Sequence, residues 1–163
     1  MKPATTRTRG RAVAFALLLA CAAGNAGAQT ATPLPGTHTV VSPYRFEVLA
    51  SRLEQAIADN QMGLVAQASA SRGAAARGVK IPGNLVLMVF RNDYAVRMLA
   101  ASVPAGIEAP LRVYVTEDRD GRTSVTWRSP SAVFAPYGNA DLNALARELD
   151  PIIEKIVRDA AGN

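Results

Sequence analysis

The sequence predicts an α+β fold, a two-layer α/β sandwich in which helices pack on one face of a mostly antiparallel sheet. The first observation behind this prediction is the alternation of apolar and polar residues over 111–128, which is typical of a hairpin with one buried face. The second is the helical spacing of apolar residues over 46–57 and 142–160. Helices on one side of such a hairpin would bury its apolar face.

The first 28 residues read as a signal peptide. Four basic residues precede an uncharged apolar run, Ala12 to Ala23, and Ala26–Ala28 forms an A-x-A cleavage site. The run is shorter than the ~20 residues that span a bilayer. In the alternative reading, Leu18–Cys21 resembles a lipobox, and Cys21 is lipidated. We therefore expect an exported protein, in the periplasm or tethered to the membrane through Cys21.

Removal of this segment changes the charge and the chemistry that remain. The chain has 18 basic and 13 acidic residues, and four basic ones precede Gln29, so the mature charge is 14 minus 13, or +1. The net charge is therefore no argument for nucleic-acid binding, and we expect no nucleic-acid partner. No cysteine remains, and His38 is the sole histidine, so we expect no disulfide, Cys nucleophile, zinc site or other cofactor. His38 lies near the new terminus, where we expect it to be solvated.

Residues 29–36 are small and polar and predict a flexible N-terminal segment, followed by one domain over 37–163. The domain opens with a short strand, 37–41. Ser42 and Pro43 have the residue types of a helix N-cap and first position, which predicts a helix over about 43–60. A strand over 64–71 and an Ala-rich helical turn over 73–77 follow.

The segment 85–90 is apolar without alternation, which predicts a strand covered on both faces. Asn92 is the expected cap of the next helix, which ends at Pro104–Gly106. The C-terminal helical stripe begins at a cap formed by Asn139 or Asp141. Pro151 interrupts it and either starts a new helix or kinks a continuous one.

The bend of the hairpin is predicted to be a three-residue loop, 119–121. In this register Gly121 takes the left-handed position of a G1 bulge and Asp118 faces Arg122. A two-residue turn at Asp120–Gly121 would mix apolar and polar groups on both faces. The spacing argues against a calcium loop, because the glycine comes too early and no Glu follows before Glu148.

The polar face of this hairpin is the candidate binding surface. Its arginines could hold a carboxylate or phosphate by charge-assisted hydrogen bonds. The ordinary interpretation is a solvated antiparallel face. The candidate residues are Arg112, Tyr114, Thr116, Thr126 and Arg128, with Ser124 beside them.

Three segments carry a family resemblance. Residues 78–90 join a glycine and a linker to an apolar strand that ends in Phe90. Residues 90–93 read Phe-Arg-Asn-Asp, and residues 109–130 hold the strand, hairpin and closing proline. Together they resemble the domain of unknown function 302 family (DUF 302), whose corresponding loop reads F-G-N-P. Phe90 and Asn92 match that loop, whereas Arg91 and Asp93 depart from it.

The resemblance implies a compact two-layer α/β fold and, for some relatives, a dimer, but it implies no activity. From the residues we expect a non-enzymatic module that binds a ligand or another protein. The alternative is an enzyme that uses carboxylate, Tyr and Arg chemistry on a small anionic substrate, with Asp93, Tyr114, Glu117 and Asp118 as its groups. The outward side of strand 85–90 needs cover, for which a second subunit or an apolar ligand is the candidate.

Overall fold

Five antiparallel strands form one sheet in the order β1-β5-β4-β3-β2. The computed structural model describes residues 32–162, and the chain from Pro33 onward forms one compact unit. The predicted signal peptide, Cys21 and residues 29–31 lie outside the described residues. The strands are β1 (Thr37–Ser42), β2 (Gly63–Ala68), β3 (Asn84–Phe90), β4 (Leu111–Glu117) and β5 (Thr123–Arg128).

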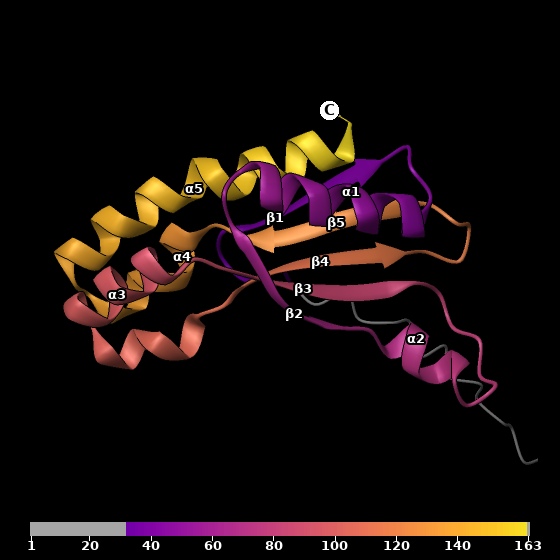
Figure 1. Cartoon of the computed structure of the whole chain (residues 1–163), viewed down its shortest axis with the longest axis horizontal. Coiled ribbons are helices and arrows are strands. Elements are labelled where there is room, and N and C mark those ends of the chain that lie inside the picture. The colour runs from indigo at the N-terminus through magenta and orange to yellow at the C-terminus, as the bar shows by residue number, and fades with distance from the viewer. Residues whose placement is uncertain (1–31, 163) are drawn as a thin grey trace, which may run out of the picture. The chain divides into compact units, whose positions relative to one another are not determined.

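Two long helices, α1 and α5, pack against one face of this sheet (Figure 1). The helices are α1 (Phe46–Asp59), α2 (Ala70–Ala75), α3 (Asn92–Ala101), α4 (Pro130–Phe134) and α5 (Ala140–Ala161), and the 3-10 helices are η1 (Val103–Glu108) and η2 (Ala135–Tyr137). None of the helices in the described part of the chain has the length and apolar character needed to cross a membrane.

The core lies between the sheet and these two helices. It is built from side chains with almost no exposed surface: Leu49, Leu53, Ile57, Leu85, Leu87, Val113, Val115, Val125, Leu142, Ile153 and Ile156. Burial of a side chain of this size stabilises a fold by about 1.5–3 kcal/mol. The α+β sandwich with helices on one face is therefore confirmed.

The prediction that β3 is covered on both faces is wrong. Burial alternates along the strand, with Leu85, Leu87 and Val89 buried and the residues between them partly exposed. Val86 and Met88 lie on the face opposite α1 and α5, which we call the outer face. An unbroken apolar run cannot reveal which of its two faces is covered, because its periodicity carries no signal.

The predicted start of the first helix is also wrong. Ser42 is the last residue of β1, and its hydroxyl donates to the Ala161 carbonyl at 3.1 Å instead of capping α1. The N-cap of α1 is Arg45, with extended backbone and no side-chain cap bond. Ser42 thus ties the end of the edge strand to the end of α5.

The N-terminal boundaries of α2, α3 and α5 are set by the residues that cap these helices. Ser69 caps α2, its hydroxyl accepting from the Arg72 N–H at 3.1 Å, so β2 ends and α2 begins earlier than predicted. Arg91, not Asn92, is the N-cap of α3. Asn139 caps α5 by accepting from the Leu142 N–H at 2.9 Å, and α5 continues through Pro151.

Residues 34–36 are ordered by contacts that their composition does not predict. The Leu34 carbonyl accepts from the Thr37 N–H at 3.1 Å, and the Gly36 carbonyl accepts from the Ser129 N–H at 2.8 Å. A turn at Gly36 therefore packs against the start of α4, and the end of the segment expected to be flexible belongs to the fold.

Candidate functional site

The β4–β5 hairpin has the predicted three-residue loop. The Asp118 N–H donates to the Arg122 carbonyl at 2.8 Å, and Gly121 has a φ of 79°. Val113 lies opposite Trp127 and Val115 opposite Val125. The register prediction is confirmed, because the bulge keeps all aliphatic side chains of the hairpin on one face.

The two faces of the hairpin separate as predicted. Val113, Val115 and Val125 are fully buried against the helices, and Trp127 is 8% exposed. The polar residues lie on the outer face, where all are partly or fully exposed: Arg112, Tyr114, Thr116, Ser124, Thr126 and Arg128.

The hydroxyl groups of the outer face mostly satisfy one another. Thr116 and Ser124 share a hydrogen bond of 3.0 Å, and Thr39 of β1 shares one of 2.9 Å with Thr126. Tyr114 is 40% exposed, and its hydroxyl forms no hydrogen bond with another described residue. Cross-strand hydroxyl pairs of this kind stabilise a sheet, so this part of the candidate surface is a solvated ladder and not a pocket.

The two arginines form a different arrangement at the end of the hairpin. Because Val113 pairs with Trp127, the next position along the ladder places Arg112 opposite Arg128 on the outer face. A pocket of about 60 Å³ lies between them, completed by Glu108, Leu111 and Val133. Like charges directly opposite each other destabilise a strand pair unless an anion lies between them.

One carboxylate, that of Glu108, already approaches Arg112. Its Oε2 lies 3.8 Å from Nη2 of Arg112, and its Oε1 accepts from the Tyr137 hydroxyl at 3.2 Å. Desolvation, followed by this hydrogen bond, raises the pKa of Tyr137. Glu108 and Tyr137 come from η1 and η2, short 3-10 segments without a periodic signal, and the sequence prediction missed both.

The guanidinium groups are only partly satisfied by protein. Arg128 donates to the carbonyls of Pro35 and Ala132 at 3.4 and 3.3 Å, both long for charged hydrogen bonds. The 3.8 Å ion pair of Arg112 is longer still, and its side chain is 63% exposed. Each guanidinium carries five N–H donors, so the pair can donate to an additional oxyanion.

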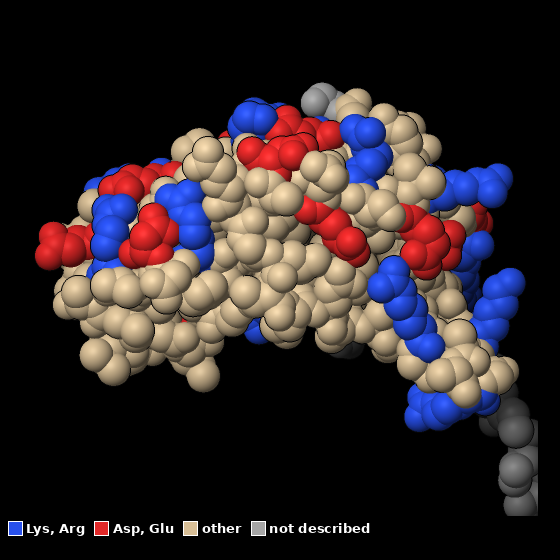
Figure 2. All heavy atoms as spheres, viewed as in Figure 1, with Lys and Arg blue, Asp and Glu red and all other residues tan. Residues whose placement is uncertain are grey.

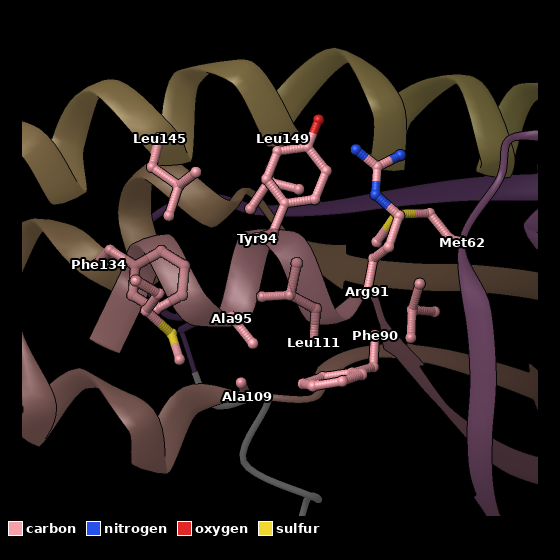
Figure 3. Close-up of a pocket in the computed structure, with 12 residues that line it drawn as sticks. Met62, Phe90, Arg91, Tyr94, Ala95, Ala109, Leu111, Phe134, Leu145 and Leu149 are labelled. Carbon is pink, nitrogen blue, oxygen red and sulfur yellow. The ribbon is translucent and has the colours of Figure 1, made fainter. Parts of the chain in front are cut away.

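The loop that resembles the family motif lines a separate apolar pocket of about 30 Å³ (Figure 3). Phe90, Tyr94 and Leu111 lie around it, and Leu111 also lines the arginine pocket. Asn92 is exposed at the start of α3. This volume holds about two water molecules, so the pocket as it stands has no room for an apolar ligand.

The two residues that depart from the family motif interact with each other. Arg91 donates to both carboxylate oxygens of Asp93 at 2.7 and 3.1 Å, and its guanidinium lies 4.1 Å above the Tyr94 ring. The Arg91 hydrogen bonds lower the pKa of Asp93. A salt bridge thus stands at the loop where the family has its glycine and proline.

Among residues 32–162, no three His, Cys, Asp or Glu side chains gather as a group that could hold a metal ion. Charged side chains of both signs lie over α3 and the N-terminal end of α5, whereas the surface below them, over η1, shows almost none (Figure 2).

Comparison with known proteins decides the family. A family model described as "Domain of unknown function DUF302" matches residues 38–160. The chain belongs to the DUF302 family. The DUF302 match covers β1 through almost all of α5, so it includes both arginines and the Phe90 loop.

A solved DUF302 structure has the same fold. The chain is similar to an uncharacterized conserved DUF302 protein from Bacillus stearothermophilus, with a TM-score of 0.70 and 17% sequence identity. The match covers 77% of this chain and 98% of that protein. No curated protein matches the chain significantly. These comparisons establish a DUF302 fold and name no activity.

Proposed function

We propose that this DUF302 protein is a ligand-binding module of the cell envelope whose Arg112–Arg128 pair holds a small oxyanion, a carboxylate or a phosphate. The observation that carries the proposal is the cross-strand placement of Arg112 and Arg128, which both line a 60 Å³ pocket. Two planar forks that face one anion give charge-assisted, geometrically specific hydrogen bonds.

The charge balance at the pocket supports the binding of an anion. Two arginines and one carboxylate, Glu108, line the pocket, so the formal charge of the lining is +1. A ligand oxyanion would offset the repulsion between Arg112 and Arg128 that the protein leaves partly uncompensated. The small volume fits an anionic group of a few atoms, with the remainder of a larger ligand outside on the open sheet.

A binding role fits these groups better than the enzyme alternative. Acid–base catalysis needs two groups in mutual reach with pKa values displaced toward neutrality. The pKa values of Asp93 and Asp118 are instead lowered by hydrogen bonds to surface partners. Glu117 accepts from the Gly83 N–H at 3.1 Å, which is a structural contact.

The location we propose is the periplasm, with attachment to the membrane only if Cys21 is lipidated. The basic, apolar and A-x-A segments at the N-terminus support export. Intact-mass measurement of protein purified from the envelope distinguishes the two cases, since cleavage after Ala28 leaves Gln29 first and lipoprotein processing leaves Cys21 first.

The experiment for the arginine pair is an NMR titration of arginine Nε–H signals with two probes, inorganic phosphate and acetate. We expect saturable shifts of Arg112 and Arg128, and about a tenfold loss of affinity in each of Arg112→Gln and Arg128→Gln, because one charged hydrogen bond contributes about 1.5–3 kcal/mol. Comparison of the two probes tells a carboxylate site from a phosphate site.

A matched control is Arg119→Gln, which removes the same charge from the tip of the same hairpin. It should bind both probes like the unaltered protein. Equal losses in Arg119→Gln and Arg112→Gln would show that only net charge attracts the anion, and absence of saturation with both probes would remove the proposed site.

We also propose a homodimer, for which a group of exposed apolar side chains on α3 and η1 is the supporting feature. Val103 and Ile107 of η1 are 73% and 82% exposed, and Val96 and Leu99 of the preceding α3 are 59% and 44% exposed. Figure 2 shows almost no charged side chains over the lower surface of this region. A second copy that buries the same patch would make a symmetric contact. Native mass spectrometry tests this by comparing the number of subunits in Ile107→Asp with that in the unaltered chain.

A further inference from the structure

Another cavity, of about 490 Å³, lies on the other side of the sheet from the arginine pair, between β1 and the middle of α5. It is lined by His38, Thr39, Val40, Trp127, Ser129, Ser131, Asp150 and Glu154. Trp127 points to the helix side of β5, whereas Arg128 points to the outer face. The cavity is therefore separate from the proposed oxyanion site, and we call it the β1–α5 groove.

An aromatic pair forms one wall of the groove. His38 lies directly opposite Trp127 in the β1–β5 ladder, and the two rings stack with centroids 5.2 Å apart and an interplanar angle of 26°. His38 is exposed and Trp127 is almost buried. His38 is solvent-exposed, as expected, but it is not unanchored, because β1 holds it in the groove and its ring stacks on Trp127.

Two carboxylates from α5 form the facing wall. Asp150 and Glu154 are four residues apart and so lie on the same side of the helix. Oδ1 of Asp150 accepts from the Ser131 N–H at 2.9 Å, and Oε1 of Glu154 accepts from Arg158 at 3.1 Å. The second oxygen of each carboxylate has no hydrogen bond to another described residue.

The charge of the groove is negative. Its lining contains Asp150 and Glu154 and neither lysine nor arginine. Arg158 is the neighbouring cation, and its bond to the half-exposed Glu154 is a surface ion pair of the kind that contributes little. The imidazole and the carboxylates are not grouped as metal ligands in the described chain, which favours an organic cation over a metal ion.

We propose that the β1–α5 groove binds an organic cation with N–H donors, of the alkylammonium class. The carboxylate oxygens of Asp150 and Glu154 would accept its hydrogen bonds, and its alkyl part would lie against the His38–Trp127 pair. The Ser129 and Ser131 side chains supply further polar groups at the same wall.

Trp127 is the only tryptophan of the chain, so its fluorescence reports on the groove directly. We would titrate the purified protein with 1,4-diaminobutane, and with 1,4-butanediol as a neutral probe of similar length. The expected result is a saturable change in Trp127 emission with the diamine and none with the diol. Glu154→Gln and Asp150→Asn should each weaken diamine binding about tenfold, since each removes one charged acceptor.

The matched control is Glu148→Gln, which makes the same change on the same helix at a residue that pairs with Arg97 and does not line the groove. Its affinity should be unchanged. Asp150 also contacts the start of α4, so Glu154→Gln, at a residue whose side chain is 53% exposed, separates binding from folding. An equal response to the diol, no saturation with the diamine, or equal losses in Glu148→Gln and Glu154→Gln would overturn the proposal.

Discussion

The hydroxyl of Thr123 donates to the backbone carbonyl of Tyr44 at 2.5 Å and approaches the carbonyl of Ser42 at 3.3 Å. Thr123 is 1% exposed, so these bonds lie in the interior at the junction of β5, β1 and the start of α1. A buried hydroxyl that satisfies the backbone between two elements fixes how the chain leaves the edge strand.

Thr123→Val should therefore destabilise the fold by about 1–3 kcal/mol, because valine keeps the shape and leaves the Tyr44 carbonyl without its donor. Thr123→Ser keeps the hydroxyl and should cost less, about 0.8 kcal/mol for the lost methyl group. Urea unfolding measures both. A valine variant no less stable than the serine variant would show that the bond contributes little.

Gly121→Ala tests the backbone of the hairpin bend. An added Cβ would meet no atom within 4 Å, so any loss of stability comes from the positive φ of 79°. We expect a cost of about 1 kcal/mol. Gly73→Ala is the matched control, because Gly73 has equally open surroundings in α2, where alanine is favoured over glycine. Urea unfolding should show opposite signs for the two variants.

Asp118 makes the stability of the same bend depend on pH. Its Oδ1 accepts from the N–H groups of Asp120 and Arg122, both at 2.9 Å, and its Oδ2 accepts from the Arg122 guanidinium at 2.8 Å. The backbone bond from Arg122, then its side-chain bond, lower the pKa of Asp118 below the ordinary 3.8. Because the folded pKa is the lower one, its stabilising effect is full above pH 3.8 and is lost as the pH falls through the folded value.

A carboxyl NMR titration should place the midpoint of Asp118 below 3.8 in the unaltered protein. Arg122→Gln removes the guanidinium and keeps the backbone N–H, so the midpoint should rise only part of the way. The hydrogen bonds from Arg97 and Lys155 likewise lower the pKa values of Glu148 and Asp159. Acid unfolding should therefore begin below about pH 4. A midpoint unaffected by Arg122→Gln would contradict the role of the guanidinium.

The hairpin could be predicted from the sequence because its register depends on residues that are close together in the chain. Alternation has a period of two, so only one register places Val113, Val115 and Trp127 on one face, and Gly121 supplies the left-handed residue that this register needs. The same register already places Arg112 opposite Arg128. Their pocket could not be predicted, because Glu108 and Tyr137 reach it from 3-10 segments that only the tertiary fold brings there.

The roles of two other residues could not be predicted, because the sequence around each of them fits more than one role. Ser42–Pro43 has the residue types of a helix start, yet the Ser42 hydroxyl is used by α5, at the far end of the chain. The stacking of His38 on Trp127 could not be predicted, because this cross-strand partner is 89 residues away. In both cases a contact distant in sequence decided the role of the residue.

The arginine pair should lower the stability of the free protein and raise that of the liganded one. Arg112 and Arg128 lie across from each other, and like charges at such positions are destabilising, by an amount that solvent reduces for side chains as exposed as Arg112. Arg112→Thr should therefore melt at the same or a slightly higher temperature without anion. With phosphate in excess, the unaltered protein gains stability by binding, and the variant gains less.

Thermal unfolding with and without inorganic phosphate, at constant ionic strength, measures both the stability of the free protein and its gain on binding phosphate. Arg119→Thr is the control, since it removes a charge at the hairpin tip and should keep the full response to phosphate. Glu108→Gln should increase the response, because it removes the carboxylate that competes for Arg112 while still accepting the Tyr137 hydrogen bond. If Arg112→Thr lowers the melting temperature without anion and leaves the phosphate response intact, Arg112 has a structural role and the pair is not a binding site.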